Sequence, residues 1–543
     1  MAALAVAIVA MAGCQKEEPI ISGGDGVHYT TTVRMAGGGT KALDASGHKT
    51  FAVGDKIAVV YKNASGDTVK AVSAALTAED IQNSGKAANF SVELENPDTG
   101  EDVTYIYPAS MANSDGTVNY TALATQNGYL NNLAKNLDLC TYTGSWSGDN
   151  LPSNVQLVNQ LAIGKFTIKN DGTTLSDIRQ LYIGDGTNGY YIKDGSNNLP
   201  STVWVAMRPV SSSQWLTFHA FKNAINKYEM ELTGKTLEAG NIYPVNVSTE
   251  KLYQGALFGT FTVNAGGSKV RFSRSNLYVM HPNMYGDNSP DNPFLWSFYN
   301  NQFDYIGNES GSGNNSYTDP GTTPNETYFD LFGWSSDKPS YCYGISHSES
   351  NTDYCIYWRD HFLDWGNNYI NNGGSGGTQY GQWRTLNKDE LVYLLTHSGA
   401  TIDGTSNACY AKGQLNVSYG VNTSHGPIHG IFLFPDHYTH PNDVAVPLGI
   451  NAGNSDIGWE GNSYSSTDWA KMEMAGAVFL PAAGTRSGRI VTEEGQSCYY
   501  WTSSIAADSL TAHYIKVTSS ELNMNATQYF YKGSAVRLVK NAN

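Results

Sequence analysis

Short runs of alternating apolar and polar residues fill the first half of the chain, each bounded by Gly, Asn or Asp. A period of two places successive side chains on opposite faces of a strand. Many short strands between turn residues are typical of antiparallel β-sandwiches rather than parallel α/β units. We therefore predict β-structure throughout residues 27–248. The clearest strands are residues 56–62, 103–108, 161–169, 203–208 and 215–221.

The second half mixes strands with helix. Residues 383–395 give the best helical pattern, because Asn387 precedes an apolar face and Glu390 completes a capping box three residues later. Residues 131–139 are a shorter helix candidate. Residues 282–381 show little periodicity but contain many aromatic side chains, which are scarce in disordered segments. We expect ordered functional loops there.

Composition places the protein outside the cytoplasm. The 543 residues hold 33 Lys and Arg against 49 Asp and Glu, a net charge of −16, with 56 Gly and 35 Tyr. Charged residues make up only 15%, whereas about 25% is usual. An acidic chain without basic clusters is a poor nucleic-acid binder. These numbers favour a β-rich surface or secreted binding protein of several domains.

The amino terminus predicts export and lipid anchoring. Residues 1–13 are almost wholly apolar and too few to span a membrane core of about 30 Å, as in a signal peptide. Ala12-Gly13-Cys14 resembles a bacterial lipobox, in which the Cys14 thiol is acylated; a buried thiol is the alternative. The following Gln-Lys-Glu-Glu resembles the export signal of Bacteroidota surface lipoproteins. We predict a lipid anchor in the outer membrane and surface exposure.

Three segments of the first half resemble the fimbrillin family of bacterial pilins and surface lipoproteins: residues 51–59, 165–169 and 237–247. The resemblance implies two transthyretin-like β-sandwiches, divided near residue 150. It also implies partnership with other fimbrial subunits through strand donation, a form of β-augmentation. Arg34 is then a candidate point of proteolytic maturation.

Three segments of the second half resemble bacterial surface domains with a C-type-lectin-like fold: residues 383–386, 475–484 and 536–539. The resemblance implies an α+β domain whose loops hold the binding surface. The predicted fold class is thus mainly β, with two transthyretin-like antiparallel β-sandwich domains followed by an α+β C-type-lectin-like domain. The expected parts are a signal peptide (1–13), a lipidated tether (14–25), two sandwiches (26–150 and 151–250) and a head (255–543).

Sugar binding is the chemistry that the second half favours most. Aromatic rings stack on the C–H faces of sugars, and amides satisfy hydroxyl groups. No calcium-binding carboxylate set of the lectin kind is present, and the acidic loop 287–291 is interpreted as a solvated turn. The candidate ligand-binding residues are Trp296, Trp358, Trp365, Trp459 and Asn462.

The sequence predicts no catalytic residue, no cofactor and no metal site. Four histidines lie within sixteen residues around Asp436, but without a metalloprotease motif we interpret them as loop residues. The five cysteines after Cys14 cannot all pair, so buried thiols are expected, with one or two disulfides as the alternative. The histidines are His425, His429, His437 and His440, and the four C-terminal cysteines are Cys342, Cys355, Cys409 and Cys498.

Together these features predict a surface lipoprotein that acts as an adhesin or as a fimbrial accessory or tip subunit. Loops of the head would bind a glycan or a protein receptor. The alternative is a lipid-anchored polysaccharide-capture component or carbohydrate-processing enzyme. Two carboxylates about 5–10 Å apart in a deep cleft would favour that alternative.

Overall fold

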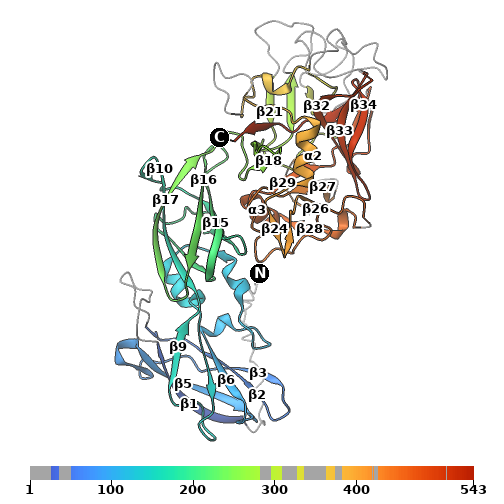
Figure 1. Ribbon diagram of the computed structural model, residues 1–543. Coiled ribbons are helices and arrows are strands. Elements are labelled where there is room, and N and C mark those ends of the chain that lie inside the picture. The colour runs from blue at the N-terminus through green and yellow to red at the C-terminus, as the bar shows by residue number, and fades with distance from the viewer. Residues whose placement is uncertain are drawn as a thin grey trace, which may run out of the picture. The chain divides into compact units, whose positions relative to one another are not determined.

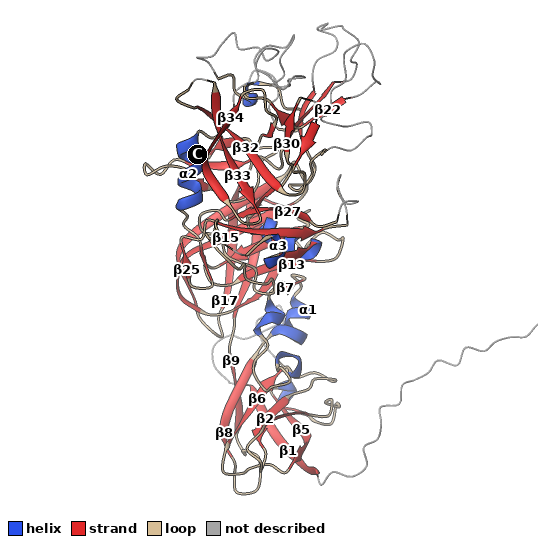
Figure 2. Ribbon diagram, turned by 90° about the vertical axis from the view of Figure 1, so that its right-hand side faces the viewer, coloured by secondary structure: helices blue, strands red, loops and turns tan. Residues whose placement is uncertain are grey.

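The structure, a computed structural model, is mainly β, with 46% strand and 10% helix among the residues that it describes. It forms two compact units, which are described separately (Figures 1 and 2). Cys14, Trp358, His425, Cys342, Cys355 and most of 282–381 lie outside the described residues. The residues described are 26–35, 50–281, 295–307, 327–335, 362–373, 382–418, 420, 426–455, 457–488, 490–508 and 510–542.

The first unit consists of the described residues up to 119, together with 139–159. Its eight strands follow the order β3-β2-β6-β8-β9-β1-β5-β4. β1 lies inside this order: it pairs antiparallel with β5 along nine residues and parallel with β9. The elements are β1 (Gly26–Met35), β2 (Ala58–Lys62), β3 (Thr68–Val72), β4 (Ile81–Gln82), η1 (Asn83–Gly85), β5 (Ala87–Glu95), β6 (Asp102–Tyr107), η2 (Ala109–Met111), β8 (Cys140–Ser145) and β9 (Val155–Asn159).

Alternation within these strands builds the core of the first unit. Phe90, Val92 and Leu94 of β5 are buried, while the residues between them face outward. The Phe51 ring meets Phe90 and Tyr107 edge-on, with ring centroids 5.4 and 5.3 Å apart. The predicted strand pattern is therefore confirmed in this region.

The second unit begins with residues 120–138, continues from 160 and includes a nine-stranded sheet. The order is β11-β10-β17-β16-β15-β12-β13-β7, and β14 pairs with β10. β10 and β17 are parallel along eight residues, as are β13 and β7 over two. The elements are η3 (Tyr120–Leu123), β7 (Thr125–Gln126), α1 (Leu130–Asn132), the π-helical turn η4 (Leu133–Leu137), β10 (Ala162–Asn170), β11 (Thr173–Thr174), β12 (Gln180–Gly184), β13 (Gly189–Lys193), β14 (Val203–Met207), β15 (Val210–Phe221), β16 (Lys227–Leu237) and β17 (Ile242–Lys251).

The same unit continues into the α+β head, whose strands form several small sheets. The longest order is β23-β35-β32-β33-β34, and a second is β28-β26-β27-β29. The first elements are β18 (Phe261–Thr262), β19 (Lys269–Phe272), β20 (Leu277–His281), β21 (Leu295–Phe298), β22 (Thr327–Phe329), β23 (Leu331–Phe332), η5 (Trp365–Asn367), α2 (Lys388–Thr396), β24 (Thr401–Ile402) and β25 (Thr405–Ser406). They are followed by β26 (Tyr410–Asn416), β27 (Ile428–Leu433), η7 (Trp459–Gly461), β28 (Ser463–Ser465), α3 (Ser466–Met474), β29 (Val478–Pro481), β30 (Thr485–Ser487), β31 (Ile490–Thr492), β32 (Ser497–Ile505), β33 (Thr511–Thr518), β34 (Leu522–Tyr529), β35 (Ser534–Ala535) and β36 (Val539–Asn541).

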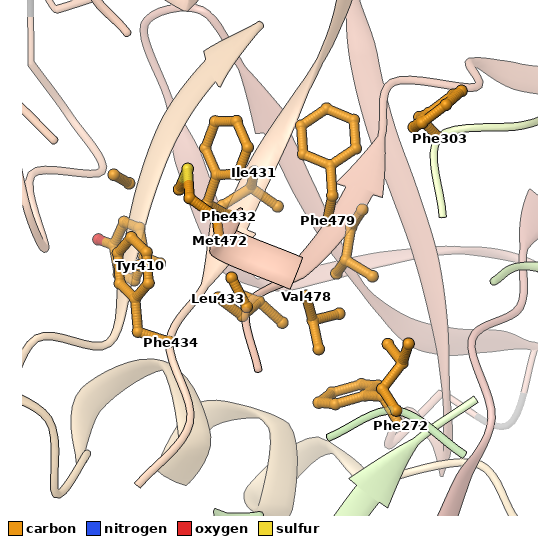
Figure 3. Close-up of a cluster of buried hydrophobic side chains, with 14 of the residues drawn as sticks. Phe272, Phe303, Tyr410, Ile431, Phe432, Leu433, Phe434, Met472, Val478 and Phe479 are labelled. Carbon is orange, nitrogen blue, oxygen red and sulfur yellow. The ribbon is translucent and has the colours of Figure 1, made fainter. Parts of the chain in front are cut away.

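Aromatic and aliphatic side chains from separate elements form the main core of this unit (Figure 3). The Phe432 ring on β27 lies 4.8 Å from that of Phe479 on β29 and 5.8 Å from that of Trp469 on α3. All three side chains are almost completely buried. This core fixes both helices against the sheets of the head.

The predicted helix at 383–395 is confirmed as α2, with the capping box expected from the sequence. The Asn387 side chain accepts from the Glu390 amide at 2.9 Å, and the Glu390 carboxylate accepts from the Asn387 amide at 3.0 Å. Leu391, Leu394 and Leu395 are buried, as their spacing predicted. None of the helices among the described residues is long and apolar enough to cross a membrane.

Replacing Asn387 by alanine is expected to lower the free energy of unfolding of the second unit by about 1 kcal/mol, because one helix N–H loses its acceptor. Chemical denaturation measures the change. Asn198→Ala is the matched control, since Asn198 is an exposed residue outside α2. Equal stability of the two variants would contradict the capping role.

The strands confirm the predicted β-rich class, with one correction. The sheets predicted as antiparallel sandwiches also contain parallel pairs, namely β1–β9, β10–β17 and β13–β7. Each parallel pair joins strands that are far apart in the sequence. Local turn signals describe neighbouring hairpins and say nothing about such distant partners.

Candidate functional site

Two predicted ligand-binding tryptophans lie in the core of the head. The Trp296 side chain is 5% exposed and the Trp365 side chain 0%. Both pack around Phe332, with ring centroids 5.5 and 6.3 Å away, and Trp365 also meets Phe362 edge-on at 5.4 Å. These rings have no open face on which a sugar can stack, so their role in the described structure is packing.

Trp459 and Asn462 are also buried. The Trp459 ring stacks on the His429 imidazole with centroids 5.8 Å apart. The Asn462 amide donates to the carbonyl oxygens of Lys412 and Leu448 at 2.7 and 2.9 Å, and accepts from the Leu448 amide at 2.7 Å. Its donors are thus used inside the protein, where they hold a loop in place.

The histidines near Asp436 that the structure describes each contact a different partner. His429 Nδ1 contacts the Gly495 carbonyl oxygen at 2.6 Å, and His440 Nε2 lies 3.1 Å from the Ala445 carbonyl oxygen. His437 Nδ1 lies 2.8 Å from a Glu231 carboxylate oxygen. Within the described ranges, no three His, Cys, Asp or Glu residues are grouped as metal ligands.

Two further predictions fall on described residues. The thiols of Cys409 and Cys498 are buried and form no disulfide, as the favoured interpretation expected. Arg34 has an exposed side chain near the end of β1, opposite Ala87 of β5 and Gln156 of β9.

A polar cavity of about 330 Å³ lies where the nine-stranded sheet meets the head, within the second unit. Its walls come from β16, the end of β17, the connection 252–256, β19 and the C-terminal β36. Six charged residues contribute to the lining: Glu229, Glu231, Glu250, Lys251, Arg271 and Lys540.

An ion pair closes one wall of this cavity. The Arg271 guanidinium donates to both Glu229 carboxylate oxygens at 2.8 Å, a bidentate pair. His219 Nε2 lies 3.6 Å from the same carboxylate, and burial holds the pKa of His219 below its usual value. Burial acts to raise the pKa of Glu229, but Arg271 and His219 outweigh it and hold that pKa below its ordinary value. Glu229 is therefore an ionised structural group.

A second carboxylate on β16 is held in the same way. The hydrogen bond to His437 holds the pKa of Glu231 below its ordinary value. The His437 ring stacks on Trp215 with centroids 4.3 Å apart, which fixes its orientation. Both β16 carboxylates of the cavity therefore face fixed partners.

Lys540 differs from the other cations because it is buried without a carboxylate partner. Its side chain is 7% exposed and donates to the Gln382 side-chain oxygen. The ammonium lies 3.4 Å from the Tyr253 ring centroid and 5.9 Å from that of Trp383. Burial lowers the pKa of Lys540 to about 8. Among the described residues it forms no ion pair.

Sequence reasoning did not find this cavity. None of Arg271, Tyr253 and Lys540 was predicted as a site residue. One signal was present: Glu229, Glu231 and Arg271 are charged residues inside alternating strands, where a buried charge needs a partner. The pairing of Glu229 with Arg271 across 42 residues could not be deduced from spacing.

No protein-family model and no curated protein matches the chain. Among solved structures, it is similar to a fimbrial assembly protein from Parabacteroides distasonis, at 12% identity over 46% of this chain and 96% of that chain, with a TM-score of 0.24. It is similar to a candidate cell adhesion protein from Bacteroides ovatus at 14% identity, over 42% and 96%, with a TM-score of 0.26. A streptococcal ancillary pilin matches at 7% identity over 49% and 79%, with a TM-score of 0.16. These identities and TM-scores assign the chain to no family.

Proposed function

We propose that this chain is a lipid-anchored cell-surface protein that acts as an adhesin or as an accessory or tip subunit of a fimbria. Its head binds a glycan or a protein receptor. The lipobox-like sequence at Cys14 supports surface anchoring, and the fimbrillin-like and C-type-lectin-like segments support the adhesive role.

The observation that carries binding over catalysis is the ionised state of Glu229 and Glu231, the two β16 carboxylates of the cavity. Arg271 and His219 hold Glu229 ionised, and His437 does the same for Glu231. A glycosidase needs a carboxylic acid with a raised pKa beside its second carboxylate. The described cavity therefore has features of a recognition site.

Assembly into a fimbria is proposed to proceed through the first unit. Cleavage after Arg34 would separate Gly26–Arg34, most of β1, from the rest of the chain. Loss of that segment would leave the edges of β5 and β9 without their partner, so that a strand of another subunit can pair there.

Limited digestion with an arginine-specific protease is expected to cut native protein after Arg34, because this side chain is exposed and lies one residue before the end of β1, where paired strands open most readily. Mass spectrometry of the products identifies the site, and Arg34→Gln should remove that cut alone. Resistance of Arg34 under conditions that cleave other exposed arginines would contradict the maturation step.

The function itself is tested by applying the full chain to an array of glycans and host proteins, followed by mass spectrometry of the bound glycans. The full chain is required because the half-buried Arg271–Glu229 ion pair joins β19 of the head to β16 of the nine-stranded sheet. Retention of an intact ligand is expected. If the glycans are shortened by the protein and the protein is not retained on the array, the result would support the carbohydrate-processing alternative and overturn the adhesin proposal.

A further inference from the structure

We propose that the cavity between β16, β17 and β36 binds a hexuronic acid residue of a glycan, with the Lys540 ammonium as the counter-ion of the sugar carboxylate. This inference rests on the proposed function and specifies its ligand class.

The charge arrangement leaves one buried cation of the cavity lining without a carboxylate partner among the described residues. Arg271 is neutralised by the bidentate contact with Glu229, and Glu231 is paired with His437. Glu250 and Lys251 are exposed residues of the lining, where solvent screens them. Lys540 alone combines burial, a position in the cavity wall and the absence of a carboxylate partner among the described residues.

A buried ammonium without a counter-ion is costly, and the surrounding groups offset the cost only in part. The Tyr253 and Trp383 rings contribute cation–π attraction, and Gln382 accepts one hydrogen bond. An ammonium has three donors. A ligand carboxylate reaching the cavity would therefore gain charge-assisted hydrogen bonds that water provides poorly at a buried site.

Size and polarity favour a single acidic sugar. A volume of about 330 Å³ lies at the small end of ligand pockets, which span about 300–1,000 Å³. The Glu250 carboxylate offers acceptors and the Asn541 amide nitrogen offers donors for sugar hydroxyl groups, while the Asn541 Oδ1 already accepts from the Arg384 side chain at 3.0 Å. A neutral sugar would leave the Lys540 ammonium uncompensated, so the carboxylate determines specificity.

The pH dependence follows from the pKa of Lys540, which burial lowers to about 8. The carboxylate is bound by the charged amine, so affinity should fall as pH rises through that value. The other titratable groups facing the cavity are Glu229, Glu231, Glu250, Lys251, Arg271 and Tyr253. The pKa values of Glu229 and Glu231 are held below their ordinary value, so both carboxylates stay ionised from pH 7 to about 9.5.

Isothermal titration calorimetry with the full chain tests the proposal, using a hexuronic-acid oligosaccharide and its carboxyl-reduced form. We expect the acidic form to bind about tenfold or more tightly than the reduced form. Affinity should decline between pH 7 and about 9.5. Lys540→Met should abolish both the preference and the pH dependence, while Lys540→Arg should keep the preference. Lys251→Met, which removes an exposed cation of the same cavity, should change affinity by less than about threefold.

Three other outcomes would overturn the inference, and they show whether the Lys540 site, the ligand class or the proposed function is wrong. Glycan binding that is unchanged in Lys540→Met, or reduced equally in Lys251→Met, refutes the Lys540 site and leaves the proposed function standing. Lys540-dependent binding of acidic peptides without acidic sugars refutes the ligand class. Absence of binding to any glycan or host protein on the array refutes the inference and the adhesin together. Circular dichroism of Lys540→Met confirms that the variant folds.

Discussion

Replacing Trp365 by alanine is expected to lower the free energy of unfolding of the second unit by about 3–5 kcal/mol, the usual cost of deleting a large buried aromatic side chain. The ring is completely buried between Phe332 and Phe362, so its removal leaves a cavity that the surrounding side chains cannot fill. Denaturant titration followed by tryptophan fluorescence and circular dichroism measures the loss.

Tyr369→Ala is the matched control, because Tyr369 follows the same 3-10 turn but its side chain is 45% exposed. We expect a change within about 0.5 kcal/mol for this variant. If Trp365→Ala were as stable as the native chain and lost only glycan binding, Trp365 would be a ligand residue after all, and its assignment to the core would be wrong.

Replacing Arg271 by methionine is expected to lower the free energy of unfolding by about 3 kcal/mol, because Glu229 would be left in a mostly buried position without its partner. The carboxylate would retain only the Gly259 amide at 3.2 Å and the nearby His219. Thermal and chemical unfolding of the native and variant chains measure the difference.

The double variant Arg271→Met with Glu229→Met should recover most of that loss, since two apolar side chains of similar length replace a mutually dependent pair. A double-mutant cycle isolates the coupling between the two residues. Additive effects of the single substitutions would show that the pair does not link the nine-stranded sheet to the head.

Local sequence signals predicted local structure well. The Asn387 and Glu390 pattern identified α2, and alternation identified most of the long strands. The same chemistry was present at α3, where Ser465 and Asp468 form a capping box before Trp469, but we predicted no helix there. The Ser465 and Asp468 capping box alone is a sufficient signal for the start of α3.

Long-range features were beyond the sequence pattern. An aromatic residue in a Gly- and Asn-rich segment packs equally well in a core or on a surface, so Trp296 and Trp365 could not be sorted without the fold. The cavity unites β16, β19 and β36, whose residues lie up to about three hundred positions apart. Its key feature is the Lys540 ammonium, which has no carboxylate partner among the described residues. This feature can be recognised only when the positions of the other charged side chains in the fold are known.

The central claim, that the chain is an adhesin held at the cell surface through Cys14, is tested most directly by an adhesion assay. Cells displaying the native chain and cells expressing Cys14→Ala are applied to surfaces coated with the ligand retained on the array, and attached cells are counted. We predict attachment by native cells, competition by soluble ligand, and loss of attachment with release of the Cys14→Ala protein. Equal attachment of both strains, or none with either, would contradict the account.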